Sequence, residues 1–150
     1  MKVFIGADHN GYLLKEKLEK YLQKVGYDVV DEGARKPQSD DDFPVFASRV
    51  VTDMLSSDLH DPRGILICGS GQGMAIAANR FKGIRAVVLQ DEEQARLSRN
   101  DDDANVLALP AYELKNDPEK VFRIVETWLS TPFESIARRV RRLQQLDELG

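Results

Sequence analysis

A glycine-rich segment in the middle of the chain has the residue types of an anion-binding loop. Residues 69–73 read GSGQG and directly follow Cys68. Glycines between a strand and a helix let backbone N–H groups converge on a phosphate or an oxyanion at the positive end of the helix. The same position favours the thiolate of Cys68, which could then act as a base. The alternative interpretation is a tight turn preceded by a small core residue.

The loop departs from a dinucleotide-binding fingerprint. Met74 occupies the position of the last glycine in G-x-G-x-x-G, and the loop follows the third predicted strand rather than the first. Asp91 lies about twenty residues further on, where that fingerprint expects an acid that binds ribose. Nucleotide binding by a non-catalytic protein therefore stays open as an alternative.

A second pair of reactive side chains, Asp8 and His9, ends the first predicted strand. The pair places a carboxylate beside the side chain whose ordinary pKa is closest to neutrality, so it can bind a sugar and move protons on it. In the alternative, Asp8 caps the following helix and His9 is a surface residue. The other histidine, His60, lies in a polar loop, and we expect it to be solvated.

Charged runs offer two further kinds of site. Aspartates fill positions 40–42 and 101–103, and carboxylates suit hard cations, but neither run has the spacing of a calcium loop. We interpret both runs as solvated loops and helix caps, and we expect no metal. Near the C-terminus, Arg138 and Arg139 belong to a group of four arginines that suits phosphate binding. A solvated helix face is the alternative.

Short β-branched runs alternate with amphipathic stretches along the chain, which indicates βαβ units and an α/β fold. Strands are predicted over residues 2–7, 27–31, 64–68, 84–89 and 105–109. Helices are predicted over residues 12–25, 42–57, 70–80, from 91, over 121–129 and over about 133–149. Ligands of such sheets bind at the carboxyl ends of the strands. We expect Asp8, the loop after Cys68 and the connection at 100–103 to lie there.

The composition of the chain argues against a nucleic-acid-binding protein and against a membrane-spanning one. The 150 residues form one domain and carry 21 Lys+Arg against 25 Asp+Glu, a net charge of −4, which argues against nucleic-acid binding. No run reaches the roughly 18 apolar residues that a membrane span needs. A single cysteine without a partner indicates a reducing compartment. We therefore predict a cytoplasmic protein with no nucleic-acid or membrane partner.

Five segments together resemble the sugar-phosphate isomerase family that contains ribose-5-phosphate isomerase type B and the two subunits of galactose-6-phosphate isomerase. They are residues 5–11 (IGADHNG), 42–44 (DFP), 64–80 (GILICGSGQGMAIAANR), 83–86 (GIRA) and 103–109 (DANVLAL). The resemblance covers nearly the whole chain in order. The resemblance implies a Rossmann-like three-layer α/β/α sandwich with a five-stranded parallel sheet and an extra C-terminal helix.

The resemblance also implies an activity and an assembly. The expected reaction interconverts an aldose phosphate and its ketose phosphate through a cis-enediolate, without metal or cofactor. The expected assembly is an oligomer of identical chains, a homodimer or a tetramer, with the helix at about 133–149 at the dimer interface.

Roles for individual residues follow from the matching motifs. Cys68 matches the base of one branch of the family, and Met74 stands where another branch has a glutamate base. Asp8 is expected to hold a sugar hydroxyl, and His9 to contact the phosphate or the ring oxygen. The expected donors to the enediolate oxygens are Ser70 and the N–H groups of Gly69, Gly71 and Gly73.

Three departures from the family pattern concern substrate recognition. Asp101 replaces a histidine that opens the sugar ring across the dimer interface, and we assign Asp102 beside it to substrate binding. Tyr112 replaces a phosphate-binding arginine. The C-terminal segment is shortened, although Arg138 and Arg139 are kept as expected phosphate ligands.

Three hypotheses follow from these departures. The first is an active isomerase of a different or shorter sugar phosphate, with Asp101 protonated or acting as the ring-opening base, or with an open-chain substrate that needs no ring opening. The second is one subunit of a hetero-oligomeric isomerase, and the third is a non-catalytic ligand-binding protein. We favour the first because Asp8, His9, Cys68 and the glycine loop are all retained.

Overall fold

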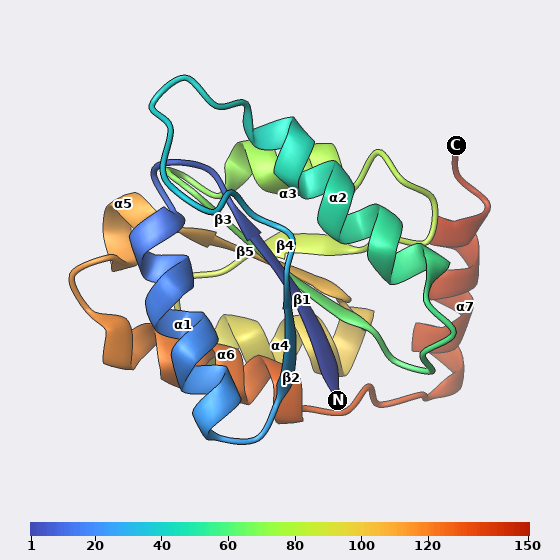
Figure 1. Cartoon of the computed structure of the whole chain (residues 1–150). Coiled ribbons are helices and arrows are strands. Elements are labelled where there is room, and N and C mark those ends of the chain that lie inside the picture. Colours follow the sequence, from blue (N-terminus) through green and yellow to red (C-terminus); the bar gives the residue numbers. More distant parts are fainter.

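The computed structural model describes residues 1–150 and contains one five-stranded parallel sheet between two layers of helices (Figure 1). The strands are β1 (Lys2–Ala7), β2 (Asp28–Asp31), β3 (Arg63–Cys68), β4 (Ala86–Val88) and β5 (Val106–Pro110). The helices are α1 (Tyr12–Lys24), α2 (Phe43–Ser56), α3 (Gln72–Ala78), α4 (Glu92–Asp102), α5 (Ala111–Leu114), α6 (Pro118–Ser130) and α7 (Ala137–Asp147). The predicted three-layer α/β/α fold with an extra C-terminal helix is confirmed.

The two helical layers bury the two faces of the sheet. Helices α1, α4 and α6 cover one face, and α2 and α3 cover the other (Figure 1). Successive side chains of a strand point to opposite faces, so Ile65 and Ile67 of β3 pack in the first core and Leu66 and Cys68 in the second. Because both faces are covered, the central strands consist of almost uninterrupted apolar residues.

The strand order β2-β1-β3-β5-β4 creates a switch point between β1 and β3. From β1 the chain moves outward to β2, and it then crosses to the other side of β1 to form β3. The loops that follow β1 and β3 therefore leave the sheet over opposite faces and leave a crevice between them. Asp8, which directly follows β1, and Cys68, the last residue of β3, both lie at this crevice.

The expectation for the connection at residues 100–103 was wrong. Helix α4 starts after β4 and must return the chain to the beginning of β5, so it runs antiparallel to the strands. Its last turn, with Asp101 and Asp102, therefore lies at the amino-terminal edge of the sheet. Within one chain these two aspartates are at the opposite edge from Cys68.

Several element boundaries also differ from the prediction. Strand β4 is shorter because the N–H of Arg85 donates to the side chain of Asn105 instead of joining the ladder. Helix α6 begins earlier than predicted, at Pro118, because the carboxylate of Asp117 accepts a hydrogen bond from the N–H of Lys120 and caps it. The short helix α5 was not predicted.

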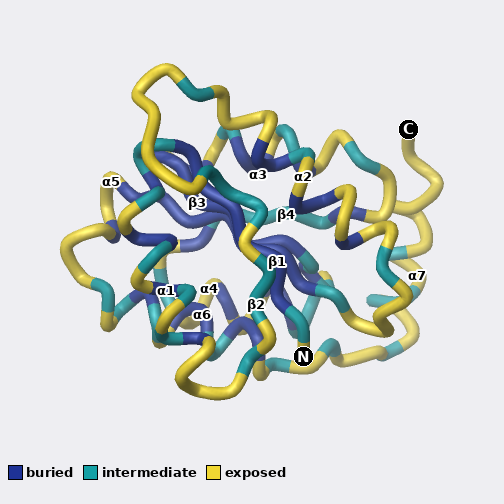
Figure 2. The backbone as a smooth tube through the Cα atoms, in the orientation of Figure 1, coloured by how far each residue is buried: buried dark blue, intermediate teal, exposed yellow.

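The C-terminal helix stands apart from both cores. It begins at Ala137, later than predicted, and residues 131–136 before it are not helical. None of its residues is buried, and Figure 2 shows most of its length exposed. None of the helices is long and apolar enough to pass through a lipid bilayer.

Candidate active site

A small cavity of about 190 Å³ opens at the crevice between β1 and β3. Its lining combines residues that follow β1, β3 and β5 with the first residue of α2. The lining residues are Asp8, Asn10, Phe43, Cys68, Gly69, Ser70, Gly73 and Tyr112. Five of these were predicted as site residues from the sequence, and Asn10, Phe43 and Tyr112 were not.

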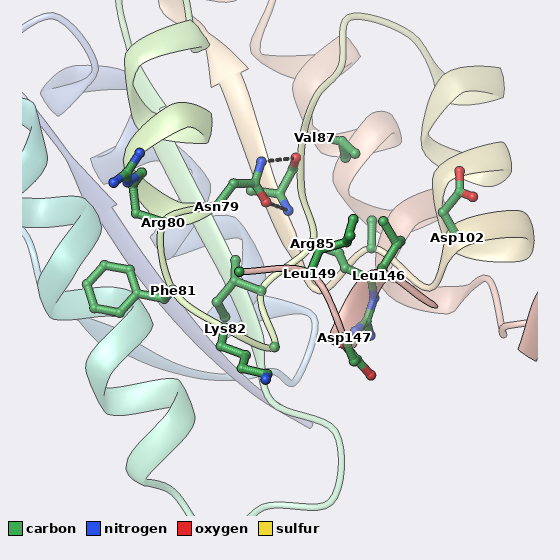
Figure 3. A pocket seen from close by; sticks show the side chains of 15 residues that line it. Asn79, Arg80, Phe81, Lys82, Arg85, Val87, Asp102, Leu146, Asp147 and Leu149 are labelled. Atoms are coloured by element: carbon green, nitrogen blue, oxygen red, sulfur yellow. Dashed lines mark hydrogen bonds between the residues drawn. The ribbon is translucent and has the colours of Figure 1, made fainter. Parts of the chain in front are cut away.

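A larger cavity lies elsewhere. It measures about 480 Å³ and is formed by residues 79–87 and the end of α7, with Leu146 and Leu149 on one wall (Figure 3). Of the predicted site residues, only Asp102 lines it. We place the candidate active site in the smaller cavity because a nucleophilic thiol, a carboxylate and a glycine loop meet there.

Cys68 ends β3 with its side chain almost fully buried. Burial raises the pKa of the thiol above its ordinary value, and the nearby Asp8 carboxylate acts in the same direction. The N–H of Gly71 donates to Sγ over 3.2 Å and acts in the opposite direction, as do other backbone N–H groups of the loop. The expectation that the loop makes Cys68 a thiolate is therefore not met in the free protein, because desolvation outweighs these hydrogen bonds.

The glycine loop turns sharply between β3 and α3. Gly71 has φ of +75°, a conformation that residues with a Cβ rarely adopt. Ser70 is exposed at the loop, and its Oγ accepts a hydrogen bond from the N–H of Gln72 over 3.3 Å. Ser70 thus places a hydroxyl at the cavity beside Cys68.

Two aromatic rings form walls of this cavity and rest on glycines of the loop. A Cβ at Gly69 would lie 2.4 Å from Cζ of Tyr112, and one at Gly73 would lie 2.7 Å from Cζ of Phe43. The N–H of Tyr112 also donates to the carbonyl of Gly69 over 2.9 Å. These glycines are therefore needed for the close approach of the rings.

Asp8 is buried at the end of β1. One carboxylate oxygen accepts hydrogen bonds from the N–H groups of Asn10, at 2.9 Å, and Gly11, at 3.1 Å. Desolvation nevertheless raises the pKa of Asp8 above its ordinary value. The N-cap of α1 is Gly11, so the alternative role of Asp8 as the helix cap is not the arrangement found.

His9 is partly buried beside Asp8 and contacts a residue that the sequence did not single out. Its Nδ1 lies 2.7 Å from Oδ1 of Asp41, and its backbone N–H donates to the same oxygen over 3.2 Å. The hydrogen bond to Asp41 raises the pKa of His9. Asp41 belongs to the run at 40–42 that was interpreted as solvated, but its side chain is only 7% exposed. His60 is exposed, as predicted.

Four predicted site residues lie away from this cavity within one chain. Asp101 forms an ion pair with Arg139, with 2.7 Å between Oδ1 and Nη2. Arg139 also pairs with Glu134. Asp102 lines the larger cavity, and Arg138 is exposed on α7. A second copy of the chain would have to bring these four side chains to the Cys68 cavity.

Comparison with known proteins gives a consistent result. Residues 3–146 match the family described as Ribose/Galactose Isomerase. Ribose-5-phosphate isomerase B of Escherichia coli is 37% identical over 145 residues, which is 97% of this chain and 93% of that protein.

Solved structures agree in fold over nearly the whole chain. A ribose 5-phosphate isomerase of Thermotoga maritima superposes with a TM-score of 0.91 at 43% identity, covering 99% of this chain and 98% of that one. Ribose-5-phosphate isomerase B of Mycoplasma genitalium, with bound ribulose-5-phosphate, gives a TM-score of 0.89 at 35% identity, covering 97% and 93%. The fold that surrounds the Cys68 cavity is therefore shared with these proteins.

Proposed function

The chain belongs to the ribose/galactose isomerase family and is an aldose–ketose isomerase of sugar phosphates, and we propose that Cys68 is the base of its reaction. The proposed substrate pair is of the ribose 5-phosphate and ribulose 5-phosphate type. The observation that carries the proposal is the meeting of Cys68, Ser70 and Asp8 in one cavity at the switch point of the sheet.

The proton transfer takes place on the open-chain sugar. The Cys68 thiolate removes the proton from C2, and the C–H electron pair forms the C1–C2 double bond while O1 takes the negative charge. The proton on O2 moves to O1, and the thiol then returns its proton to C1. The aldose becomes the ketose, and the thiolate is restored.

The cavity can support each charge that forms in this sequence. Ser70 and the loop N–H groups are donors for the oxygens of the cis-enediolate, and preorganised donors of this kind stabilise a transition state strongly. Asp8 can accept a hydrogen bond from a sugar hydroxyl. Burial of Cys68 makes its thiolate scarce at neutral pH but more basic, which favours abstraction of a proton from carbon.

The remaining assigned residues require a second copy of the chain. Asp101 lies at the opposite edge of the sheet, so its proposed part in ring opening depends on a homodimer in which it reaches the partner's cavity. The exposed helix α7 supports this assembly, because Ile136, Val140 and Leu143 give it an apolar stripe that neither core covers. Arg139 offsets the charge of Asp101. Arg138 is a proposed phosphate ligand.

We place the enzyme in the cytoplasm, since its one cysteine is unpaired and the reaction needs it as a free thiol. No metal or cofactor enters the proposed mechanism.

The test is isomerisation by the purified chain, with a chelator present, of aldose phosphates of four, five and six carbons. Turnover of one of them by the isolated chain supports the proposal. Turnover that appears only with a second, related subunit would replace it with the hetero-oligomeric alternative.

A further inference from the structure

The carboxylate of Asp41 is held in an unusual place for an aspartate in a polar loop. The loop between β2 and α2 turns this side chain inward, so that only 7% of it is exposed. Oδ1 accepts both the backbone N–H and the Nδ1–H of His9. Oδ2 is buried without any hydrogen-bond partner. A buried carboxylate with one unpaired oxygen is costly for the fold.

The contact decides which nitrogen and which charge His9 offers to a ligand. Because Nδ1 donates to Asp41, only Nε2 is left for another partner. The charged groups acting on the ring are Asp8, Asp40 and Asp41, and all three favour the imidazolium. Asp41 has the largest effect on the pKa of His9, and desolvation opposes it.

The candidate cavity otherwise lacks a cation from its own chain. None of its lining residues is a lysine, an arginine or a histidine, and the lining includes the acid Asp8. A sugar phosphate brings about −1.5 to −2 charges at neutral pH. Potential ligand atoms of Asp8, His9 and Asp41 all lie within 4.8 Å of one another, so the ring of His9 lies close to Asp8, which lines this cavity.

We propose that Asp41 is a positioning residue for His9, and that its buried carboxylate makes His9 the cation which this chain itself offers to the phosphorylated substrate. The proposal rests on the proposed isomerase function for the identity of the substrate. The pKa of His9 and its response to inorganic phosphate can be measured without turnover, so this part of the proposal does not depend on that function.

The test compares Asp41→Asn with Asp40→Asn. Both variants remove one negative charge from the same loop, but Asp40 is exposed and makes no hydrogen bond to His9. Asparagine at position 41 keeps an oxygen that accepts hydrogen bonds and loses the charge. NMR titration of the imidazole gives the pKa of His9.

Asp41→Asn is expected to lower the pKa of His9 and to raise KM for ribose 5-phosphate on the order of tenfold near neutral pH, with a much smaller change in kcat. The loss in affinity should shrink at about pH 5.5, where a histidine of ordinary pKa is also protonated. Inorganic phosphate should shift the His9 resonances of the unaltered protein at lower concentrations than those of Asp41→Asn. Asp40→Asn should lower the pKa of His9 by less than Asp41→Asn does, because Asp40 has the smallest effect of the three acids. Its KM and its phosphate binding should resemble those of the unaltered protein.

Three results would overturn the proposal. The first is a pKa of His9 in the unaltered protein no higher than the ordinary histidine value of about 6.5. This measurement needs no variant and so stands even if Asp41→Asn does not fold. The second is a loss of thermal stability in Asp41→Asn with KM and phosphate binding unchanged, which would make Asp41 purely structural. The third is chelator-sensitive activity with loss of divalent-cation binding in Asp41→Asn, which would make the pair metal ligands. If no sugar phosphate is turned over but the titration and phosphate results hold, the proposed function fails and the pairing of Asp41 with His9 stands.

Discussion

Replacing Gly71 by alanine tests whether the glycine loop is held in a conformation that only glycine adopts easily. Gly71 has φ of +75°, and placing a residue with a Cβ in this region costs about 1–2 kcal/mol. The added Cβ would also lie 3.1 Å from Cγ1 of Val88 and 3.3 Å from the nitrogen of Pro110. Such overpacking costs about 1 kcal/mol or more. The expected loss of stability is therefore about 2–3 kcal/mol.

The control is Gly26→Ala at the end of α1. Gly26 also has positive φ, +101°, but a Cβ there would meet nothing within 4 Å. This variant should lose only the conformational part, about 1–2 kcal/mol. For a chain of this size, 1 kcal/mol corresponds to a change in Tm of about 2–4 °C. Thermal unfolding at equal protein concentrations therefore separates the two variants.

Activity separates them further. The N–H of Gly71 donates to Sγ of Cys68, so a shifted loop disturbs the base as well as the fold. Gly71→Ala should lower kcat, whereas Gly26→Ala should leave it unchanged. A Gly71→Ala protein with unchanged Tm and unchanged kcat would refute the reasoning that connects this backbone conformation to the site.

Three other predictions concern the same cavity. Ser70→Ala should lower kcat about 10²-fold with little change in Tm, as measured by steady-state kinetics and thermal unfolding, because Ser70 is exposed and is a proposed donor to the enediolate. The raised pKa of Cys68 should make kcat/KM increase with pH beyond neutrality, and a pH profile that falls over this range would contradict the thiolate base. The raised pKa of His9 adds stability that is fully present below its unfolded pKa of about 6.5 and is lost as pH rises through its higher folded pKa. The difference in unfolding free energy between the unaltered protein and Asp41→Asn should therefore decrease as pH rises, in denaturant titrations at several pH values.

The strands and most helices were predictable because their patterns are local. Residues 64–68 form an apolar run between Arg63 and the glycine loop. The helix after Tyr12 repeats leucines at helical spacing up to Gly26. Helix α5 was missed because four residues are too few to show a period. The start of α7 was set too early because the prediction began the helix directly after Pro132, whereas residues 131–136 are not helical.

The site was predictable where residues follow strands that are neighbours in the sheet. Cys68 and Asp8 each come at the end of a strand, and β1 pairs directly with β3. The error about Asp101 came from treating the connection before β5 as if it followed a strand. A helix that connects two parallel strands must end near the start of the second strand. The last turn of α4 therefore lies at the amino-terminal edge of the sheet, which the alternation of strands and helices along the chain is enough to predict.

Asp41 was beyond the reach of sequence patterns. Three adjacent aspartates are chemically alike, and nothing local tells which of them turns inward toward His9, 32 residues away. Tyr112 could have been found, since the resemblance had marked its position as that of a phosphate-binding arginine. Its contact with Gly69 across the cavity depends on the pairing of β3 with β5.

The central claim is that this chain isomerises a sugar phosphate with Cys68 as the base. The most direct measurement is the conversion of ribose 5-phosphate to ribulose 5-phosphate, with a chelator present, by the purified protein and by Cys68→Ala, each with its Tm recorded. We predict turnover by the unaltered protein and loss of nearly all of it in Cys68→Ala, with the fold retained. Substantial turnover by a folded Cys68→Ala protein would contradict the claim.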